Sequence, residues 1–404
     1  ALNLFQAYAK DNPKDARAHY LLAMAHSGKR NVQQAKAELA EAVKLNPKWD
    51  EPRSLLAQIS LREGNDAQAI EQINGVLKDH PQNLQAYALL GNTHLRKRNI
   101  SGAVKAFEEM VRIAPNNPTG YIQLGRALFI QKKEKEALAQ LEKALSLQPN
   151  ALEPLQMIVG YHMNNKDPKK ALERVEQQVK ASPKNPRLYN MLGIVHEANR
   201  DNANAEANLK KAIEMDPNQP GLHTSLANFY MRQRMLDKAR AEYSAAVEKS
   251  PNNLTAHMAL GMIYENEKNY AKAQEAYEKV LKINPNFVPA ANNLAYIYAE
   301  RGGNIDVALN LAQKAKEQAP EDPNISDTLG WIYYKKNVPG RAVAYLKEAA
   351  EKVPDQPIVR YHLGMAYYKN GERDLAKAEL NEALRLNAGF PGADEARATL
   401  NALK

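Results

Sequence analysis

The chain contains no cysteine in its 404 residues. This absence excludes disulfides, thiolate metal ligands and a cysteine nucleophile. It fits a reducing cytosol, and it fits equally an envelope protein that needs no disulfides. No apolar run approaches the roughly 18 residues of a membrane-spanning helix, and no targeting segment is visible. The sequence also lacks a His-Glu-x-x-His motif, a phosphate-binding glycine loop and a Gly-x-Ser-x-Gly elbow, so we expect no catalysis.

Proline, by contrast, recurs at a fixed interval. Prolines stand 34 residues apart at every step but one, at positions 13, 47, 81, 115, 149, 183, 217, 251, 285, 320 and 354. The exceptional step, from Pro285 to Pro320, has 35 residues and contains the pair Gly302–Gly303. A fixed period of this length predicts one supersecondary unit that is repeated and stacked. Such an array needs no single large core, so it replaces the two or three globular domains that this chain length would otherwise suggest.

Each unit holds two amphipathic stretches with helical spacing and a polar turn between them. With the third residue after each proline as position one, eleven units begin at residues 16, 50, 84, 118, 152, 186, 220, 254, 288, 323 and 357. Position seven is Leu or Ile in every unit, position twenty is always Ala, and position eight is Gly or Ala except for Val159. A small residue at position eight allows two helix backbones to approach closely, so the pattern predicts packed helix pairs.

These positions resemble the tetratricopeptide repeat family, whose pattern runs through an aromatic residue, Leu-Gly, Tyr, Ala, Phe, Ala and a closing Pro. Tyr87-Ala-Leu-Leu-Gly91 and Asp327-Thr-Leu-Gly-Trp-Ile-Tyr333 are close matches. The resemblance implies an all-α fold, a right-handed α-solenoid of stacked antiparallel helix pairs whose first helices line the concave face. Val159 and Gln178 depart from the pattern and predict looser packing in the fifth unit, and Ala388 replaces the closing proline.

The two ends of the repeat pattern differ. Residues 1–15 correspond to the second helix of a unit whose first half is missing, so we expect the natural protein to be longer at its N-terminus. Residues 16–387 form the eleven tetratricopeptide repeats, and residues 388–404 predict one further helix. Terminal units of solenoids commonly cover the exposed face of their neighbour, so we expect this helix to be a cap.

The nine histidines do not indicate a metal or proton-transfer site. Seven of them fall at positions four and eleven, which are large-residue packing positions of the repeat, namely His19, His223, His257, His26, His94, His162 and His196. Paired carboxylates occur only as charged helix residues such as Glu108 and Glu109. We therefore expect no enzyme activity, no metal and no cofactor.

Binding residues are expected on the first helix of each unit, at positions two, five, nine and twelve, which lie opposite the packing positions. The residues that we predict to contact a partner are Asn228, Met258, Met262, Tyr296, Trp331, Tyr334, Tyr361, Met365 and Tyr368. Tyrosine, tryptophan and methionine are favoured at binding hot spots. The aromatic residues of the last three units indicate either a pocket for an extended peptide or helix, or a groove that packs against itself, the cap or a second copy.

The turns within the units carry the entire net positive charge of the chain. Positions twelve to fifteen contain sixteen Lys or Arg and five Glu, whereas the whole chain has a net charge of +9. The predicted basic edge consists of Arg96, Lys97, Arg98, Arg232, Arg234, Lys335 and Lys336. It would suit an anionic polysaccharide, a membrane surface or an acidic partner, or it simply complements the helix dipole. We do not expect nucleic acid, because no aromatic platform accompanies the basic residues.

These observations favour a non-catalytic scaffold that binds a partner protein or peptide in the concave groove. The segments Asp327–Lys335 and Val359–Met365 are also similar to bacterial envelope repeat proteins of exopolysaccharide export. That similarity implies a periplasmic or outer-membrane-associated protein rather than a cytoplasmic one. An alternative is the recognition arm of a larger enzyme, such as a glycosyltransferase, whose catalytic domain lies outside this chain. A third possibility is self-association through the open ends of the solenoid.

Overall fold

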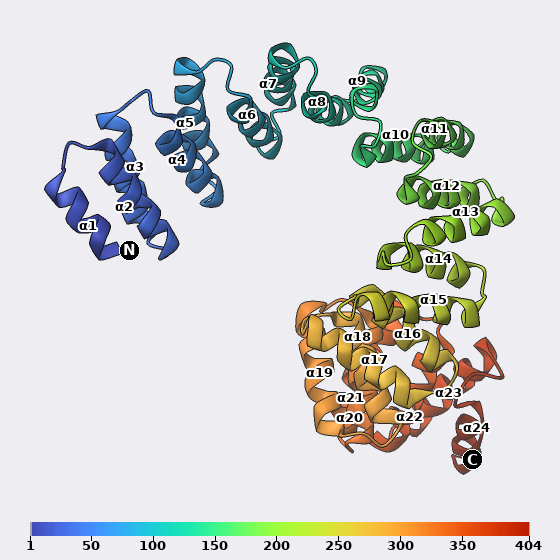
Figure 1. Cartoon of the computed structure of the whole chain (residues 1–404). Helices are drawn as coiled ribbons and strands as arrows, with labels where there is room; N and C mark the ends of the chain where they lie inside the picture. The colour runs from blue at the N-terminus through green and yellow to red at the C-terminus, as the bar shows by residue number, and fades with distance from the viewer. Residues whose placement is uncertain (1, 404) are drawn as a thin grey trace. The chain divides into compact units, whose positions relative to one another are not determined.

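The computed structural model describes residues 2–403, which form 24 helices and no strand (Figure 1). Helix α1 (Leu2–Asp11) precedes eleven helix pairs, and α24 (Ala393–Ala402) follows them. The first helices are α2 (Ala16–Gly28), α4 (Asp50–Arg62), α6 (Leu84–Arg96), α8 (Pro118–Ile130), α10 (Leu152–Asn164), α12 (Pro186–Ala198), α14 (Pro220–Arg232), α16 (Leu254–Asn266), α18 (Val288–Glu300), α20 (Pro323–Lys335) and α22 (Pro357–Asn370).

The second helix of each pair follows after a turn of three residues, except for four between α18 and α19 and two between α22 and α23. These helices are α3 (Val32–Leu45), α5 (Asp66–Asp79), α7 (Ile100–Ile113), α9 (Glu134–Leu147), α11 (Pro168–Ala181), α13 (Asn202–Met215), α15 (Leu236–Lys249), α17 (Tyr270–Ile283), α19 (Ile305–Gln318), α21 (Pro339–Lys352) and α23 (Arg373–Leu386). The helices form two compact units, Ala1–Ala205 and Glu206–Lys404. None of the helices in residues 2–403 has the length and apolar character that crossing a bilayer requires.

Most first helices begin at polar caps or prolines. The Oδ1 atoms of Asn83, Asn117 and Asn185 accept hydrogen bonds of 3.0, 2.9 and 3.1 Å from backbone N–H groups of the following turn, which satisfies donors that the helix leaves free. Proline stands in the first turn of α8, α12, α14, α18, α20 and α22, where its missing N–H costs nothing. The sequence therefore defines where most first helices start; α4 and α10 follow Trp49 and Ala151, which make no side-chain cap bond.

Each first helix is followed within two residues by a residue with left-handed backbone. Position fifteen has φ between 56° and 85° in all eleven units, at Arg30, Gly64, Arg98, Lys132, Lys166, Arg200, Arg234, Lys268, Gly302, Asn337 and Gly371. At Lys132, the next N–H bonds back to the Leu128 carbonyl at 2.9 Å, which is the Schellman arrangement at a helix end. The ninth unit has four turn residues instead of three, Arg301 to Asn304, so the 35-residue step is an insertion in this turn.

The two helices of a pair meet at positions eight, twenty and twenty-four. The alanine at position twenty is fully buried in every unit. A Cβ atom added to Gly125 would lie 2.8 Å from Leu141 Cγ, so the leucine occupies the space that the glycine leaves. The fifth unit has Val159 at position eight and the smaller Val175 at position twenty-four, in the same buried cluster. Gln178 is also buried, and its amide bonds to Arg174 at 3.0 Å and to the Pro149 carbonyl. Although these residues are buried, α10 and α11 contact each other less extensively than the helix pairs α8–α9 and α14–α15 do, which agrees with the looser packing predicted for this unit.

A side-chain donor at position four holds the loop before most units. The carbonyl of the closing proline accepts from it in the pairs His19–Pro13, Arg53–Pro47, Tyr121–Pro115, Tyr189–Pro183, His223–Pro217, His257–Pro251 and Arg360–Pro354. Elsewhere Gln178 and Lys316 bond to the carbonyls of Pro149 and Pro320. Position four was expected only to pack; the structure shows that it also fixes the loop by hydrogen bonding.

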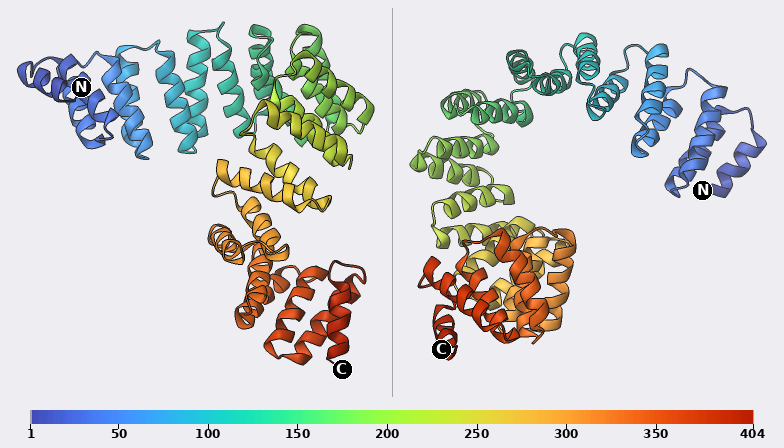
Figure 2. Two further views of the ribbon diagram at one scale, coloured as in Figure 1. Left: turned by 60° about the horizontal axis from the view of Figure 1, so that its bottom comes forward. Right: turned by 180° about the vertical axis from the view of Figure 1, so that it is seen from behind.

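The first helices of the last three units contact one another as well as the second helix of their own unit. Within Glu206–Lys404, α18, α20, α22 and α24 contact each other in succession, and Figure 2 shows α24 beside α22 and α23 at the C-terminal end. Positions five and nine of these helices therefore lie in a seam between neighbours. This arrangement decides which of the predicted binding residues are accessible.

Candidate binding surfaces

The first-helix surface consists of the residues at positions two, five, nine and twelve of each first helix. At position nine, Met24 and Ile194 are exposed in the first compact unit. In the second, Met262 is 49% exposed, whereas Trp331 and Met365 are 3% and 4% exposed. The surface is therefore open on α16 and closed on α20 and α22.

An aromatic cluster closes the surface at α20 and α22. The Trp331 ring stacks on Tyr334 and His362, with centroids 4.5 and 4.0 Å apart. Tyr361 packs against Phe390 in the segment before α24, and its hydroxyl donates to Glu395 at 2.6 Å. Trp331, Tyr361 and Met365 were predicted to contact a partner. They instead pack against each other and against α24, because neighbouring first helices are in contact here, and they offer no surface to a partner.

The polar groups of this cluster are satisfied internally. Trp331 Nε1 donates to Glu300 at 2.6 Å, and Lys335 Nζ lies 3.0 Å from the same carboxylate. Burial opposes ionisation of Glu300, but these contacts outweigh it and lower its pKa. His362 Nδ1 lies 2.9 Å from Asp327, and both side chains are buried. Burial and the bond to Glu395 raise the pKa of Tyr361. The cluster therefore has the properties of a core.

The other predicted contact residues keep some exposure. Tyr296 and Tyr334 are half-buried, Lys369 lies 4.5 Å above the Tyr334 ring, and Tyr368 is exposed. Their role in binding stays a prediction. On α14 and α16, Asn228 and Met258 are half-buried beside the exposed Met262. These residues form the accessible part of the predicted site in Glu206–Lys404.

Tyrosines of the second helices orient amides on this surface. Tyr243 Oη donates to Asn228 Oδ1 at 2.5 Å, which leaves the Asn228 NH2 group available to a ligand. Asn293 donates to Tyr277 Oη at 3.1 Å. The buried Oδ1 of Asn292 has no hydrogen-bond partner among the described residues. Asn292 and the hydrogen-bonding tyrosines Tyr243 and Tyr277 were not among the residues predicted from the sequence; tyrosine rather than phenylalanine at position twenty-four was the available signal.

A second opening lies on the first-helix surface of Ala1–Ala205. It has a volume of about 230 Å³ and lies between α4, α5 and α6. Ser54, Gln58 and Gln85 contribute polar groups to it, and Ile73 and Val76 contribute apolar ones. An uncharged lining of this kind suits a peptide segment.

The predicted basic edge is partly neutralised. Arg96 pairs with Asp66 and donates to the Leu61 carbonyl at 2.6 Å. Lys335 pairs with Glu300, and Lys336 pairs with Asp306. Arg98 and Arg234 are turn residues with φ of 58° and 59°, and they are exposed, as are Lys97 and Arg232. Basic residues that end helices fit the dipole interpretation, and contact with a polysaccharide or membrane stays a prediction. Within residues 2–403, no group of three or more His, Cys, Asp or Glu could hold a metal ion.

Family models of tetratricopeptide repeats match successive segments of the chain. A family model described as the cytochrome c-type biogenesis protein H TPR domain matches residues 7–121. Tetratricopeptide repeat models match residues 197–263 and 337–400, 118–151 and 255–287, 276–307, and 161–220. No curated protein matches the chain.

Three solved structures are similar to this chain at low sequence identity and with TM-scores below 0.5. A tetratricopeptide repeat protein from Parabacteroides merdae is 18% identical with a TM-score of 0.43, and the match covers 62% of this chain and 98% of that one. The APC/C hetero-tetramer Cut9–Hcn1 is 15% identical with a TM-score of 0.48, and the match covers 100% of this chain and 92% of that one. YrrB, a TPR protein described as having an unusual peptide-binding site, is 22% identical with a TM-score of 0.39. The match covers 47% of this chain and 97% of that one. The repeat models together match most of the chain, and with the helix pairs they show that the chain is a tetratricopeptide repeat protein, of a generally non-catalytic fold that serves as a scaffold for protein–protein interaction.

Proposed function

We propose that this chain is a non-catalytic scaffold that holds a partner protein or peptide on its first-helix surface, with α14, α16 and α18 as the contact region in Glu206–Lys404. The observation that carries this proposal is the exposure of Met262, 49% at a position that α20 and α22 bury. Methionine is flexible and polarisable, so an exposed one can adapt to several apolar side chains.

The groups around Met262 suit a peptide backbone. The Asn228 NH2 group is a donor, since its carbonyl oxygen already accepts from Tyr243. An extended peptide presents C=O groups along its length that such a donor can bind, and pockets for its side chains give specificity. Met258 and Met262 would supply apolar contact on the same surface.

The similarity to exopolysaccharide-export proteins does not indicate the cellular compartment of this scaffold. In the segment Asp327–Lys335, the residues from Asp327 to Tyr333 are buried, and Tyr361 and Met365 of the second segment are buried too. The likeness therefore reflects how the last units pack, and we infer no compartment from it.

A peptide selection tests the proposal. A phage-displayed library of random peptides is selected on the whole chain, and enriched peptides are synthesised and titrated by fluorescence anisotropy. Met262→Glu should weaken binding at least about tenfold, a loss of about 1.4 kcal/mol. Val307→Glu is the matched control, because Val307 is 43% exposed but lies on the second helix α19, and it should change binding less than about twofold. Failure to enrich any peptide, or equal effects of the two variants, would refute the proposed site.

A further inference from the structure

Two units share a histidine that lies between two acceptors; it is half-buried at His19 and buried at His223. His19 Nε2 lies 3.1 Å from the Pro13 carbonyl and Nδ1 lies 2.6 Å from Glu38. In the seventh unit, His223 makes the same contacts at 3.1 Å to Pro217 and 2.7 Å to Glu242. Both carboxylates stand at position twenty-three of the second helix.

The last repeat keeps this arrangement with an arginine. Arg360 at position four donates to the Pro354 carbonyl at 3.0 Å and to Glu379 at 2.9 Å. Glu379 again stands at position twenty-three. A nitrogen-bearing side chain at position four thus contacts a carboxylate at position twenty-three in three units of the chain.

His257 keeps only half of this arrangement. Its Nε2 lies 2.9 Å from the Pro251 carbonyl, which orients the ring as in the other two units, and the side chain is buried at 8% exposure. Position twenty-three is Ala276, so the carboxylate is missing. Nδ1 has no hydrogen-bond partner among the described residues. Where the other units have the carboxylate, this unit has a cleft of about 280 Å³ between α15, α16 and α17.

The charges at this cleft favour an anion. Lys272 and Lys279 line it from α17 together with Glu275, so the fixed charges sum to a positive value. The ammonium of Lys272 lies 5.5 Å from the centre of the Tyr264 ring, which also lines the cleft. A volume of about 280 Å³ exceeds several times the roughly 30 Å³ that one water occupies, so it can admit a carboxylate side chain.

We propose that this cleft binds an acidic side chain, glutamate or aspartate, of a partner protein, whose carboxylate takes the place that Glu38 and Glu242 occupy beside their histidines. The three pairs within the chain show how such a side chain reaches position four from a neighbouring helix. This site goes beyond the proposed first-helix contact, since none of the residues that line the cleft belongs to that surface.

Binding at this site is coupled to a proton. The Pro251 carbonyl can only accept, so Nε2 of His257 carries a hydrogen. Nδ1 can then donate to a carboxylate only when the ring is doubly protonated. The other charged groups at the cleft are Lys272, Lys279 and Glu275 of α17, and α15 contributes only Val247. Histidine is the side chain that ordinarily changes charge near neutral pH, so the carboxylate should bind more weakly as the pH rises.

Nuclear magnetic resonance of the whole chain tests the site directly. The probe is N-acetyl-glutamate N′-methylamide, the neutral control is N-acetyl-glutamine N′-methylamide, and N-acetyl-alanine supplies a terminal carboxylate. The glutamate probe should shift the signals of His257 and Tyr264, and should bind about tenfold more tightly at pH 5.5 than at pH 8. Equal shifts from the glutamine probe, tighter binding of N-acetyl-alanine, or no shift at all would overturn the proposal.

A variant tests the geometry independently of any ligand. Ala276→Glu places the missing carboxylate within the chain, so the titration midpoint of the His257 signal should rise by about one pH unit. Ala276→Gln has the same shape without the charge and should leave the midpoint where it is. An unchanged midpoint in folded Ala276→Glu would contradict the inferred orientation of Nδ1. Neither result depends on Met262, so the proposed function and this site can fail separately.

Discussion

At the scale of single residues, positions eight and twenty-four fill one shared volume. Gly125 faces Leu141, and a Cβ atom on the glycine would lie 2.8 Å from the leucine Cγ and 3.2 Å from the Ala137 carbonyl oxygen. Where position eight is Val159, position twenty-four is Val175. In these two units, a larger residue at one of the two positions accompanies a smaller residue at the other, as close packing of the helix pair requires.

Gly125→Ala should therefore destabilise the chain by about 1–3 kcal/mol, because the backbone oxygen of Ala137 cannot yield as a side chain can. Gly160 provides a matched control, since it lies in α10 with no heavy atom within 4 Å of an added Cβ. Gly160→Ala should stabilise by about 0.5–1 kcal/mol through helix propensity. Urea unfolding followed by circular dichroism measures both, and a stabilising Gly125→Ala would refute the shared-volume account.

The sequence predicted these packing residues because sterics repeat with the period. It did not predict the hydrogen-bonding role of position four, because His, Tyr and Arg have no side-chain size or polarity in common. Their shared property is a donor at the reach of the preceding proline carbonyl, as at Tyr189 and His223. Reading that property requires knowing where the carbonyl points, which depends on the loop conformation.

At the scale of helices and turns, the left-handed residue at position fifteen carries strain in most units. Seven of these residues are Lys or Arg, with φ between 56° and 63°, although this conformation costs an L-residue with a side chain about 1 kcal/mol. The charge near a helix C-terminus offsets part of that cost.

Lys132→Gly should accordingly stabilise the fold by about 0.5–1 kcal/mol, because glycine adopts this conformation without strain. The same substitution at Lys143, an exposed residue inside α9, should destabilise by about 1 kcal/mol. Differential scanning calorimetry of the two variants compares them directly. Destabilisation by both would show that backbone strain is not what glycine relieves at residue 132.

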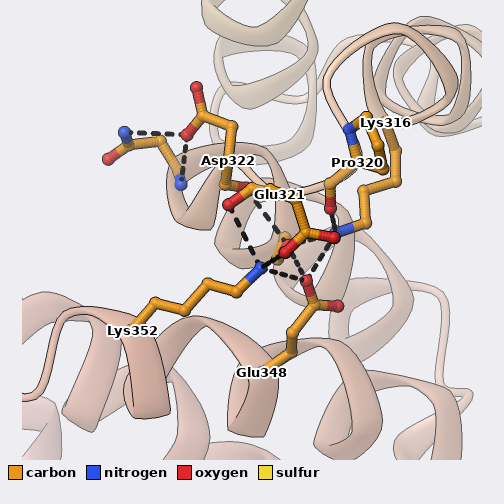
Figure 3. Close-up of polar contacts among 8 residues, drawn as sticks. Lys316, Pro320, Glu321, Asp322, Glu348 and Lys352 are labelled. Carbon is orange, nitrogen blue, oxygen red and sulfur yellow. Dashed lines mark hydrogen bonds and ion pairs between the residues drawn. The ribbon is translucent and has the colours of Figure 1, made fainter.

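An ion-pair network joins three helices around Glu348 (Figure 3). Lys316 Nζ of α19 lies 2.7 Å from Glu348 Oε1 of α21, and Lys352 Nζ lies 3.1 Å from the same atom. Ser326 of α20 donates to this carboxylate at 3.2 Å. Lys352 also reaches Glu321 at 2.7 Å. The network thus ties the ninth unit to the tenth.

The network should make stability depend on pH. Burial opposes ionisation of Glu348, but the hydrogen bonds from Lys316 and Lys352 outweigh it and lower the pKa. A lowered pKa means that the stabilisation is present above the unfolded value of about 4.3 and is lost as the pH falls through the folded value. Glu348→Gln should cost about 1 kcal/mol at pH 7 and progressively less below pH 4, by thermal unfolding at each pH. A cost that is independent of pH would exclude this ionic contribution.

The accessibility of positions five and nine could not be predicted at this scale. Met262 and Trp331 occupy the same position of their units, yet one is exposed and the other buried. The difference arises because α20 and α22 contact each other directly. That contact is made between neighbouring units, and no residue in the repeat pattern encodes it by itself.

At the scale of the whole molecule, helices contact mainly their neighbours in sequence. The stability of such an array is approximately a sum of unit terms and nearest-neighbour terms. Opening can then occur locally, with a free energy set by the units involved. A defect in one unit should lower the protection of that unit and its neighbours and leave distant units unchanged.

Hydrogen exchange of the Gly125→Ala variant measures how far along the chain a local defect lowers amide protection. The added methyl strains α8 against α9, so amide protection should fall in these two helices and in the adjoining α7 and α10. Helices α2 and α3 of the same compact unit, which are separated from the substitution by whole helix pairs, should exchange as in the unsubstituted chain. The same holds for α20 to α23 in the other compact unit, because their neighbours are unchanged. A uniform loss of protection throughout Ala1–Ala205 would instead mean that this unit opens only as a whole, since nearest-neighbour terms cannot transmit a local defect evenly over that distance.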